Sequence, residues 1–326
     1  MGYKSICVIL GNTVSDMRMH FAARHLERAG YEVEVLSQVP HFKTVQHDGF
    51  IISRPGIQMI DFIGVALATG KPVIVDMDDN FKLIPPENPA YSIIGRGNLD
   101  YVTALYNMIK SVTMLTAPKP EILTAYERYG EVIPNGWDEE NELWKVDNVE
   151  RDGFINIGWA GTTTHRQDFQ LVLPALKQIL SEREDVRVVI GGDPAIYNEF
   201  WEFSERKKLF LVGTPYERYP LMFAFWDMLL APLEDTEFNR YKSDIKLVEA
   251  GARGIPWIAS PLPQYERWAT GGILTPDSGW IGSLMALIDN GEFRQSLAEQ
   301  GKAQALTRTS AEIGKLWVNI VKEVIG

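Results

Sequence analysis

The sequence is poor in cysteine, has no long apolar run and carries too little positive charge to offset its acidic residues. Cys7 is the single cysteine among 326 residues, which excludes a disulfide framework and fits a reducing compartment. No segment approaches the roughly eighteen consecutive apolar residues of a membrane-spanning helix. The apolar part of the N-terminus, up to Leu10, is too short for a signal peptide. We therefore expect a cytoplasmic protein without an integral membrane segment.

The charge balance excludes some classes of partner. Lysine and arginine number 32 against 43 aspartate and glutamate residues, which gives a net charge of −11 and a pI near 5.1. Proteins that bind nucleic acid tightly and non-specifically need a basic surface, which this balance opposes without excluding a local basic site. The five histidines show no metal-ligand spacing with the cysteine, so the sequence predicts no zinc site.

Two stretches of the chain alternate between strand and helix patterns. Short apolar runs separated by segments of helical periodicity are typical of βαβ units and a parallel sheet. The polar stretch 136–150 has no periodicity and is the expected linker. The sequence predicts an α/β protein of two doubly wound Rossmann-like domains with an interdomain cleft. The expected parts are a first domain at 1–135, a second at 151–305, and a last helix at 306–326 that returns to the first domain.

The segment 239–260 predicts a nucleotide site. It reads as a polar loop, a short helix and a buried strand, and a loop between two parallel strands is where open α/β sheets bind ligands. Ser243 is the predicted N-cap, so free N–H groups and the positive dipole end would face a phosphate. The spacing of Lys242, Lys246 and Glu249 places them on one helix face, with cations for a diphosphate and a carboxylate for ribose hydroxyls. A solvated surface ion pair is the alternative interpretation.

Four motifs along the chain resemble those of GT-B glycosyltransferases, in particular the family-4-like retaining group. EVIPNGWD at 131–138 is similar to the inter-domain signature of that group, and IGWAGTTTHRQD at 157–168 to the first strand and loop of its nucleotide-binding domain. The stretch 239–260 resembles the helix whose glutamate holds the donor ribose. VDMDDN at 75–80 resembles an aspartate-rich segment of one branch of these enzymes. The resemblance implies the GT-B fold and transfer of a sugar from a nucleotide-diphosphate sugar.

The resemblance also implies roles for individual residues. Glu249 would bind the ribose hydroxyls, while Lys246, together with Lys242, would neutralise the diphosphate. Gly161, with Thr162 and Thr163, would let the second-domain loop approach the phosphates, although an ordinary turn at a strand end also explains that glycine.

Two positions depart from the pattern of the family. His165 and Arg166 stand in the loop where many members carry an arginine and a lysine. Tyr241 stands where many members carry a glutamate, eight positions before Glu249. His165 is thus either a phosphate contact or a residue that caps the helix beside Asp168.

The first domain offers candidates of its own. Asp76, Asp78 and Asp79 directly follow a buried strand, where they would bind a cation, act as a base or hold acceptor hydroxyls. Capping of the next turn is the structural alternative. A metal-dependent GT-A transferase or an aspartate-nucleophile phosphatase fits less well, because of the second alternating half and Asn80 respectively. Arg18 opens the first helix and would meet acceptor or phosphate, unless it is simply solvated.

We therefore expect a sugar-nucleotide-dependent glycosyltransferase that acts with retention and needs no divalent metal or bound cofactor. Its partners would be the nucleotide-sugar donor and a glycan, lipid or small-molecule acceptor. Transfer to a hydroxylated base of modified DNA is one alternative, and the acidic balance opposes it. A non-catalytic subunit that binds a sugar nucleotide is the other, suggested by Tyr241 at the usual carboxylate position.

Overall fold

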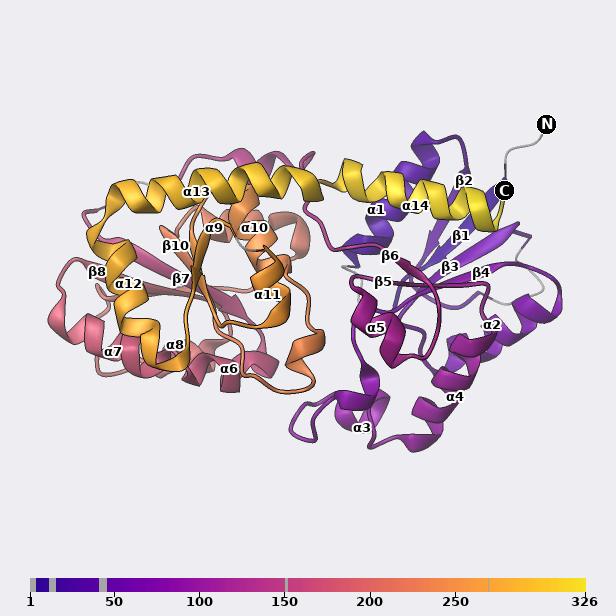
Figure 1. The fold of residues 1–326 in the computed structure, drawn as a ribbon, viewed down its shortest axis with the longest axis horizontal. Coiled ribbons are helices and arrows are strands. Elements are labelled where there is room, and N and C mark those ends of the chain that lie inside the picture. Colours follow the sequence, from indigo (N-terminus) through magenta and orange to yellow (C-terminus); the bar gives the residue numbers. More distant parts are fainter. Residues whose placement is uncertain (1–3, 12–15, 41–45, 150–151, 269) are drawn as a thin grey trace. The chain divides into compact units, whose positions relative to one another are not determined.

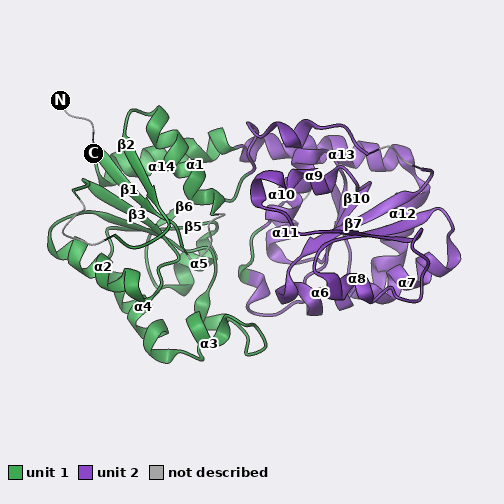
Figure 2. Cartoon of the chain, turned by 180° about the vertical axis from the view of Figure 1, so that it is seen from behind, with its two compact units in different colours: residues 1–136, 241–243, 310–326 green, residues 137–240, 244–309 purple. Residues whose placement is uncertain are grey.

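The chain folds into two compact units, each built on a parallel β-sheet. The computed structural model describes residues 4–11, 16–40, 46–149, 152–268 and 270–326. Unit 1 comprises Met1–Gly136, Tyr241–Ser243 and Ser310–Gly326, and unit 2 comprises Trp137–Arg240 and Asp244–Thr309 (Figure 2). Positions 150 and 151, where we placed the end of the linker and the start of the second domain, lie outside the described residues. Across the described ranges, none of the helices has both the length and the hydropathy needed to cross a membrane.

The sheet of unit 1 runs in the order β2-β1-β3-β4-β5-β6 among the described residues, with every pairing parallel. Its strands are mostly buried because they come from the short apolar runs of the sequence. They are β1 (Ser5–Ile9), β2 (Glu32–Leu36), β3 (Gly49–Ser53), β4 (Val73–Asp76), β5 (Met114–Ala117) and β6 (Glu131–Val132).

Helices cover both faces of this sheet (Figure 1). They are α1 (Met17–Arg28), α2 (Ile57–Ala68), α3 (Tyr91–Ile94), α4 (Leu99–Ser111), α5 (Pro120–Ala125) and α14 (Ser310–Val324). α14 comes from the far end of the sequence and packs beside α1, where its apolar face, including Ile313 and Trp317, joins the core of β1 and β3. A side chain at Gly314 would meet the ring of His25 at 2.1 Å, so this close helix contact requires glycine.

The sheet of unit 2 has the order β12-β11-β10-β7-β8-β9 within the described part of the chain. If β7 is counted as strand 1 and the sheet is read from β9 to β12, this order is 3-2-1-4-5-6, which is found in dinucleotide-binding Rossmann folds. The strands are β7 (Ile155–Gly161), β8 (Val186–Gly192), β9 (Lys208–Leu211), β10 (Met228–Ala231), β11 (Trp257–Ala259) and β12 (Gly272–Leu274). The predicted doubly wound α/β architecture is thus confirmed.

Helices again lie on both faces of the sheet of unit 2. They are α6 (Arg166–Gln170), α7 (Leu173–Glu182), α8 (Pro194–Asn198), α9 (Pro220–Phe223), α10 (Ile245–Arg253), α11 (Pro263–Trp268), α12 (Trp280–Asp289) and α13 (Gly291–Ala305). One core lies under α7 and α12, and the other under α9, α10 and α11. The helical stretch after β7 is divided into α6 and α7, and Pro174 stands in the first turn of α7, where its missing N–H costs nothing.

The expected linker contributes to the core of unit 2. Trp137 and Trp144 are buried beside α9 and α10, and their rings meet edge to face at 5.9 Å. The indole N–H of Trp137 donates to the backbone oxygen of Ala305 at 2.8 Å. A polar stretch without periodicity is therefore held in place by two isolated aromatic side chains.

Candidate functional site

Each sheet has one point where the chain reverses its direction of travel across the strands. In unit 1 this switch point lies between β1 and β3, and in unit 2 between β7 and β10. Open α/β sheets bind ligands at the carboxyl ends of the strands that flank such a point. Most of the predicted site residues lie in loops that follow these strands or their neighbours.

A buried ion pair forms the centre of the unit 1 site. Arg18 binds Asp76 through two parallel hydrogen bonds, with Nε donating at 2.8 Å and Nη2 at 2.7 Å. Asp76 also accepts a 2.7 Å bond from the hydroxyl of Thr116, and Arg18 Nη1 donates to the Ile133 oxygen and to Asn135. Asp76 is fully buried. Two of the predicted site residues therefore bind each other and fix the loops around the strand ends.

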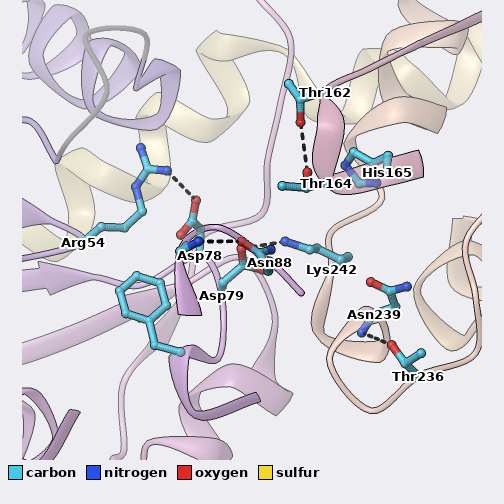
Figure 3. Close-up of polar contacts among 12 residues, drawn as sticks. Arg54, Asp78, Asp79, Asn88, Thr162, Thr164, His165, Thr236, Asn239 and Lys242 are labelled. Atoms are coloured by element: carbon cyan, nitrogen blue, oxygen red, sulfur yellow. Dashed lines mark hydrogen bonds and ion pairs between the residues drawn. The ribbon is translucent and has the colours of Figure 1, made fainter. Parts of the chain in front are cut away.

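A second, more accessible layer surrounds Arg54 at the end of β3. Its backbone has a φ of 42°, a left-handed conformation that is costly for a residue with a side chain. Its guanidinium lies 3.3 Å from Asp16 and 3.3 Å from Asp78, and Figure 3 shows the pair with Asp78. A Cβ on Gly11 would come within 3.3 Å of the Arg54 side chain, so glycine allows this close packing.

The remaining aspartates of the cluster differ in their surroundings. Burial, together with the neighbouring Asp79, Asp16 and Asp76, raises the pKa of Asp78 to about 6 against the opposing effect of Arg54. Asp79 forms a 2.7 Å ion pair with Lys242, which is drawn in Figure 3 and belongs to the short segment counted with unit 1. The predicted capping role is filled instead by Asn80, whose side chain accepts from the backbone of Lys82.

The loop after β7 carries Gly161 and three threonines at the switch point of unit 2. A Cβ on Gly161 would lie 2.6 Å from the indole of Trp159, so packing alone already requires glycine there. The hydroxyls of Thr162 and Thr164 lie 2.9 Å apart (Figure 3). Thr163 begins a 3₁₀ helix that ends at His165.

Asp168 organises the loops around this switch point. It is buried, and one carboxylate oxygen accepts from the backbone N–H of Glu234 and from the amide of Asn239, both at 2.9 Å. Its other oxygen lies 2.9 Å from Nδ1 of His165. Gln264 in turn donates to the Asn239 oxygen at 2.9 Å. The carboxylate therefore fixes the ring of His165 and ties the loop after β7 to the loop after β10.

Arg166, the next predicted donor contact, is turned to a different partner. Its Nε and Nη2 bind the carboxylate of Asp193 at 2.6 and 3.0 Å. Asp193 also caps α8 by accepting from the backbone of Ala195. The arginine thus joins the ends of β7 and β8 in a geometry that leaves part of the guanidinium exposed.

The start of α10 differs from the prediction. Ser243 is not the N-cap: the helix begins at Ile245, and Asp244 precedes it without a side-chain capping bond. Arg308 holds the Asp244 carboxylate at 3.0 Å, which removes it from a capping role. Lys242 therefore stands outside the helix, and the predicted single face of Lys242, Lys246 and Glu249 is wrong for its first member. Tyr241 ends a 3₁₀ helix in the same loop.

Lys246 and Glu249 do lie together on α10. The Lys246 ammonium is 5.5 Å from the ring centre of Trp159, and it lowers the pKa of Glu249 electrostatically. Burial has the larger effect and raises the pKa of the Glu249 carboxyl to about 8. Tyr219 hydrogen-bonds this carboxyl and stacks beside Tyr216 at 6.4 Å. A buried carboxyl, a phenol and an ammonium thus meet next to the switch-point strands.

A cavity of about 440 Å³ opens in unit 2 where β10, β11 and β12 end. It is lined by Leu233, Glu234, Asp235, Thr236, Ser260 and Asp277, among other residues. Thr236 accepts from the backbone of Asn239, which connects the cavity wall to the Asp168 network (Figure 3).

Sequence reasoning missed several polar residues at the two switch points. They are Asp16, Ser53, Arg54 and Asn239. The signal for Arg54 was available, since it directly follows an apolar strand in the same way as the aspartates of 76–79. For Tyr219 the sequence left open a nucleobase contact or a plain surface role, and neither indicated its partner Glu249, which is 30 positions away.

No protein-family model and no curated protein sequence matches this chain. Solved structures do match over nearly the whole length. A trehalose-6-phosphate synthase studied for glycosyl transfer with retention is 10% identical over 98% of this chain and 99% of that one, with a TM-score of 0.67. WaaG, a glycosyltransferase of lipopolysaccharide biosynthesis, is 13% identical over 99% of each chain, with a TM-score of 0.67.

A third match belongs to a different reaction class. A putative UDP-N-acetylglucosamine 2-epimerase from Listeria monocytogenes is 13% identical over 99% of this chain and 96% of that one, with a TM-score of 0.57. At such identities the likeness concerns the fold. The chain has the GT-B fold, with two Rossmann-like units, as the sequence motifs implied.

Proposed function

We propose that the protein is a glycosyltransferase that moves a sugar from a nucleotide-diphosphate sugar to an acceptor hydroxyl. The observation that carries the proposal is the buried Glu249 carboxyl, held by Tyr219 beside Lys246 on the helix that follows a switch-point strand. A buried carboxyl with few partners suits the paired hydroxyls of a ribose, and the neighbouring ammonium suits a diphosphate. The Rossmann strand order of unit 2 and the GT-B fold support the same assignment.

The donor would be held by residues of three loops. In this proposal Lys246 neutralises the diphosphate. Lys242 and Ser243, which shortly precede it in the sequence, would contribute to the same contact. Gly161, Thr162 and Thr163 offer backbone and hydroxyl groups to the phosphates. His165, whose ring is fixed by Asp168, and the exposed part of Arg166 would extend this contact, while Tyr241 would face the sugar.

Transfer requires the bond between the sugar and the diphosphate to break as the acceptor oxygen bonds the same carbon. The acceptor proton passes to the leaving diphosphate, whose charge Lys246 stabilises, so no divalent metal is essential in this scheme. We propose that the new bond forms with retention, as in the trehalose-6-phosphate synthase study. Asp78 and Asp79 would hold acceptor hydroxyls, and the buried pair of Arg18 and Asp76 would position them.

Two steps test the proposal. First, a thermal-shift screen of nucleoside diphosphates and their sugars identifies the donor, since a ligand that prefers the folded state raises the melting temperature. Second, calorimetry compares Glu249→Ala with Glu266→Ala, which removes the same side chain from an exposed position of α11. We expect Glu249→Ala to weaken donor binding by roughly tenfold to a hundredfold, the usual cost of leaving hydrogen-bonding groups without a partner. Unchanged binding by Glu249→Ala would contradict the proposal.

Because the 2-epimerase is similar in fold, epimerisation of a sugar nucleotide is a second reaction that must be distinguished from sugar transfer. An epimerase converts the sugar nucleotide into its epimer without an acceptor, whereas a transferase releases nucleoside diphosphate only as sugar leaves the donor. Incubation of the identified donor with and without pooled glycan, lipid and modified-DNA acceptors, in the presence of a chelator, distinguishes these outcomes. Formation of an epimer with no acceptor present would replace the transferase assignment.

A further inference from the structure

Three potential metal ligands meet at one edge of the unit 1 sheet, outside the site described above. Cys7 lies on β1, Glu34 on the neighbouring strand β2, and His47 two residues before β3. Each offers one ligand atom, and these atoms all lie within 4.8 Å of one another. Among the residues that the structure describes, this is the one group of three histidine, cysteine or acidic side chains that meets this condition.

The sheet itself brings these side chains together. Cys7 and Glu34 are register partners of two parallel strands, so their side chains project from the same face. His47 is placed by the next residue: Asp48 and Ser5 exchange two hydrogen bonds, one backbone at 2.8 Å and one through the Asp48 carboxylate at 2.9 Å. The ring of His47 also meets Phe50 edge to face at 6.3 Å. The arrangement is therefore held by the fold.

One nitrogen of the imidazole is unsatisfied. Nε2 of His47 lies 2.8 Å from the Glu34 carboxylate, whereas Nδ1 is buried and has no hydrogen-bond partner within the described structure. A neutral imidazole that donates through one nitrogen carries a lone pair on the other, and burying that lone pair without a partner is unfavourable. Coordination of a metal ion by Nδ1 would compensate for that cost.

We propose that Cys7, Glu34 and His47 form a binding site for Zn²⁺. Sulfur, imidazole nitrogen and carboxylate oxygen are the ligands that zinc takes in proteins, and a thiolate disfavours magnesium and calcium. Tetrahedral zinc holds such atoms about 3.3–3.6 Å apart, given bond lengths of about 2.0–2.3 Å. The three ligand atoms lie within 4.8 Å of one another, so small side-chain movements would bring them to this spacing and leave the fourth position to water.

The exposure of the three side chains gives the ion a route. Glu34 is 54% exposed and His47 16% exposed, while Cys7 is fully buried. An ion would enter past the carboxylate and reach the thiol last. Its binding forms the zinc–sulfur bond and releases the thiol proton to solvent. The bound ion would tie the edge strand β2 to β1 and to the segment before β3, so we expect it to stabilise unit 1.

Metal titration of the whole protein, prepared without a histidine tag, tests the proposal. We expect one Zn²⁺ per chain by calorimetry, and a rise in melting temperature with Zn²⁺. Co²⁺ in place of Zn²⁺ should give a thiolate-to-cobalt charge-transfer band in the near ultraviolet, which reports the bond to Cys7 directly. Zn²⁺ that binds without this Co²⁺ signal would overturn the assignment of Cys7.

Substitutions within the cluster distinguish Zn²⁺ binding at this site from adventitious Zn²⁺ binding elsewhere on the protein. His47→Gln and Glu34→Gln should each weaken Zn²⁺ binding by about a hundredfold or more, the upper range for losses around a metal site. Cys7→Ser should abolish the cobalt band, and the two glutamine variants keep the test decisive if the core substitution disturbs folding. Glu32→Gln is the matched control, since Glu32 lies on the same strand and face. Equal affinity of His47→Gln and wild type would refute the proposal, whatever the sugar-transfer activity.

Discussion

The two switch points have the same architecture and different chemistry. In unit 1 the strand ends carry a network of opposite charges, centred on Arg18 with Asp76 and on Arg54 with Asp78. In unit 2 the corresponding position carries glycine, threonine hydroxyls and amides around one buried carboxylate, Asp168. The parallel sheet determines where a ligand can be bound, and the side chains determine what kind of ligand it is.

The cores of the two units differ as well. Eight of the nine tryptophans belong to unit 2, and Trp317 on α14 is the one in unit 1. In a Trp317→Phe background, tryptophan fluorescence therefore reports unit 2 alone, while circular dichroism reports both units. This asymmetry allows the effects of a substitution to be assigned to one unit.

The largest effect is expected for the charged centre of unit 1. Asp76→Ala leaves the buried Arg18 without its partner and should cost about 3–5 kcal/mol, as breaking a buried ion pair usually does. In the Trp317→Phe background, circular dichroism should show an early unfolding step in urea that fluorescence does not follow. Asp61→Ala, on the exposed surface of α2, is the control. Coincident curves for both probes would contradict this prediction, because they would mean that the substitution destabilises both units together.

A smaller effect is expected for the buried carboxylate of unit 2. Asp168→Ala removes the acceptor for the Glu234 N–H and the Asn239 amide, and should cost about 1–3 kcal/mol, the usual cost of leaving buried donors unpaired. The midpoint of urea unfolding by fluorescence should fall accordingly. Asp277→Ala, an exposed residue of the same unit, should leave the midpoint unchanged. A loss of equal size in both variants would contradict a special role for Asp168.

The smallest expected change is that over a single pH unit, and it concerns Glu249. Its pKa is raised to about 8 in the folded state, so between the unfolded value near 4.5 and pH 8 the folded chain binds the extra proton. Stability from this group is therefore fully present below about pH 4.5 and is lost as pH rises to 8, by about 1 kcal/mol between pH 6 and pH 7. Glu249→Gln should flatten this slope in urea titrations at several pH values. Parallel slopes for variant and wild type would show that Glu249 is ionised in the folded protein.

The alternating pattern predicted the sheets well because strand burial and helix periodicity are local properties. Element ends were less predictable, since they depend on distant partners. The start of α10 moved from Ser243 to Ile245, where Asp244 meets Arg308, a residue 64 positions later. The division between α6 and α7 has a local cause, because Pro174 stands in the first turn of the second helix.

The sequence predicted that candidate-site residues lie at strand ends, but it did not predict which of them contact one another. The rule that ligand groups follow buried strands located Asp76, Asp78 and Gly161, and it would also have located Arg54. It did not indicate that Arg18 and Asp76 bind each other, because they are 58 positions apart. The absence of metal-ligand spacing in the sequence likewise gave no sign of the Cys7, Glu34 and His47 cluster, which depends on the pairing of strands β1 and β2.

The sequence by itself determined two alternating α/β halves, their parallel sheets and the placement of polar loops at strand ends, because these follow from the spacing of apolar residues along the chain. Only the tertiary structure decided which charges meet, as with Lys242 and Asp79, which are 163 positions apart. Electrostatic attraction and burial act between atoms that are close in space, and the order of residues in the chain does not specify that closeness.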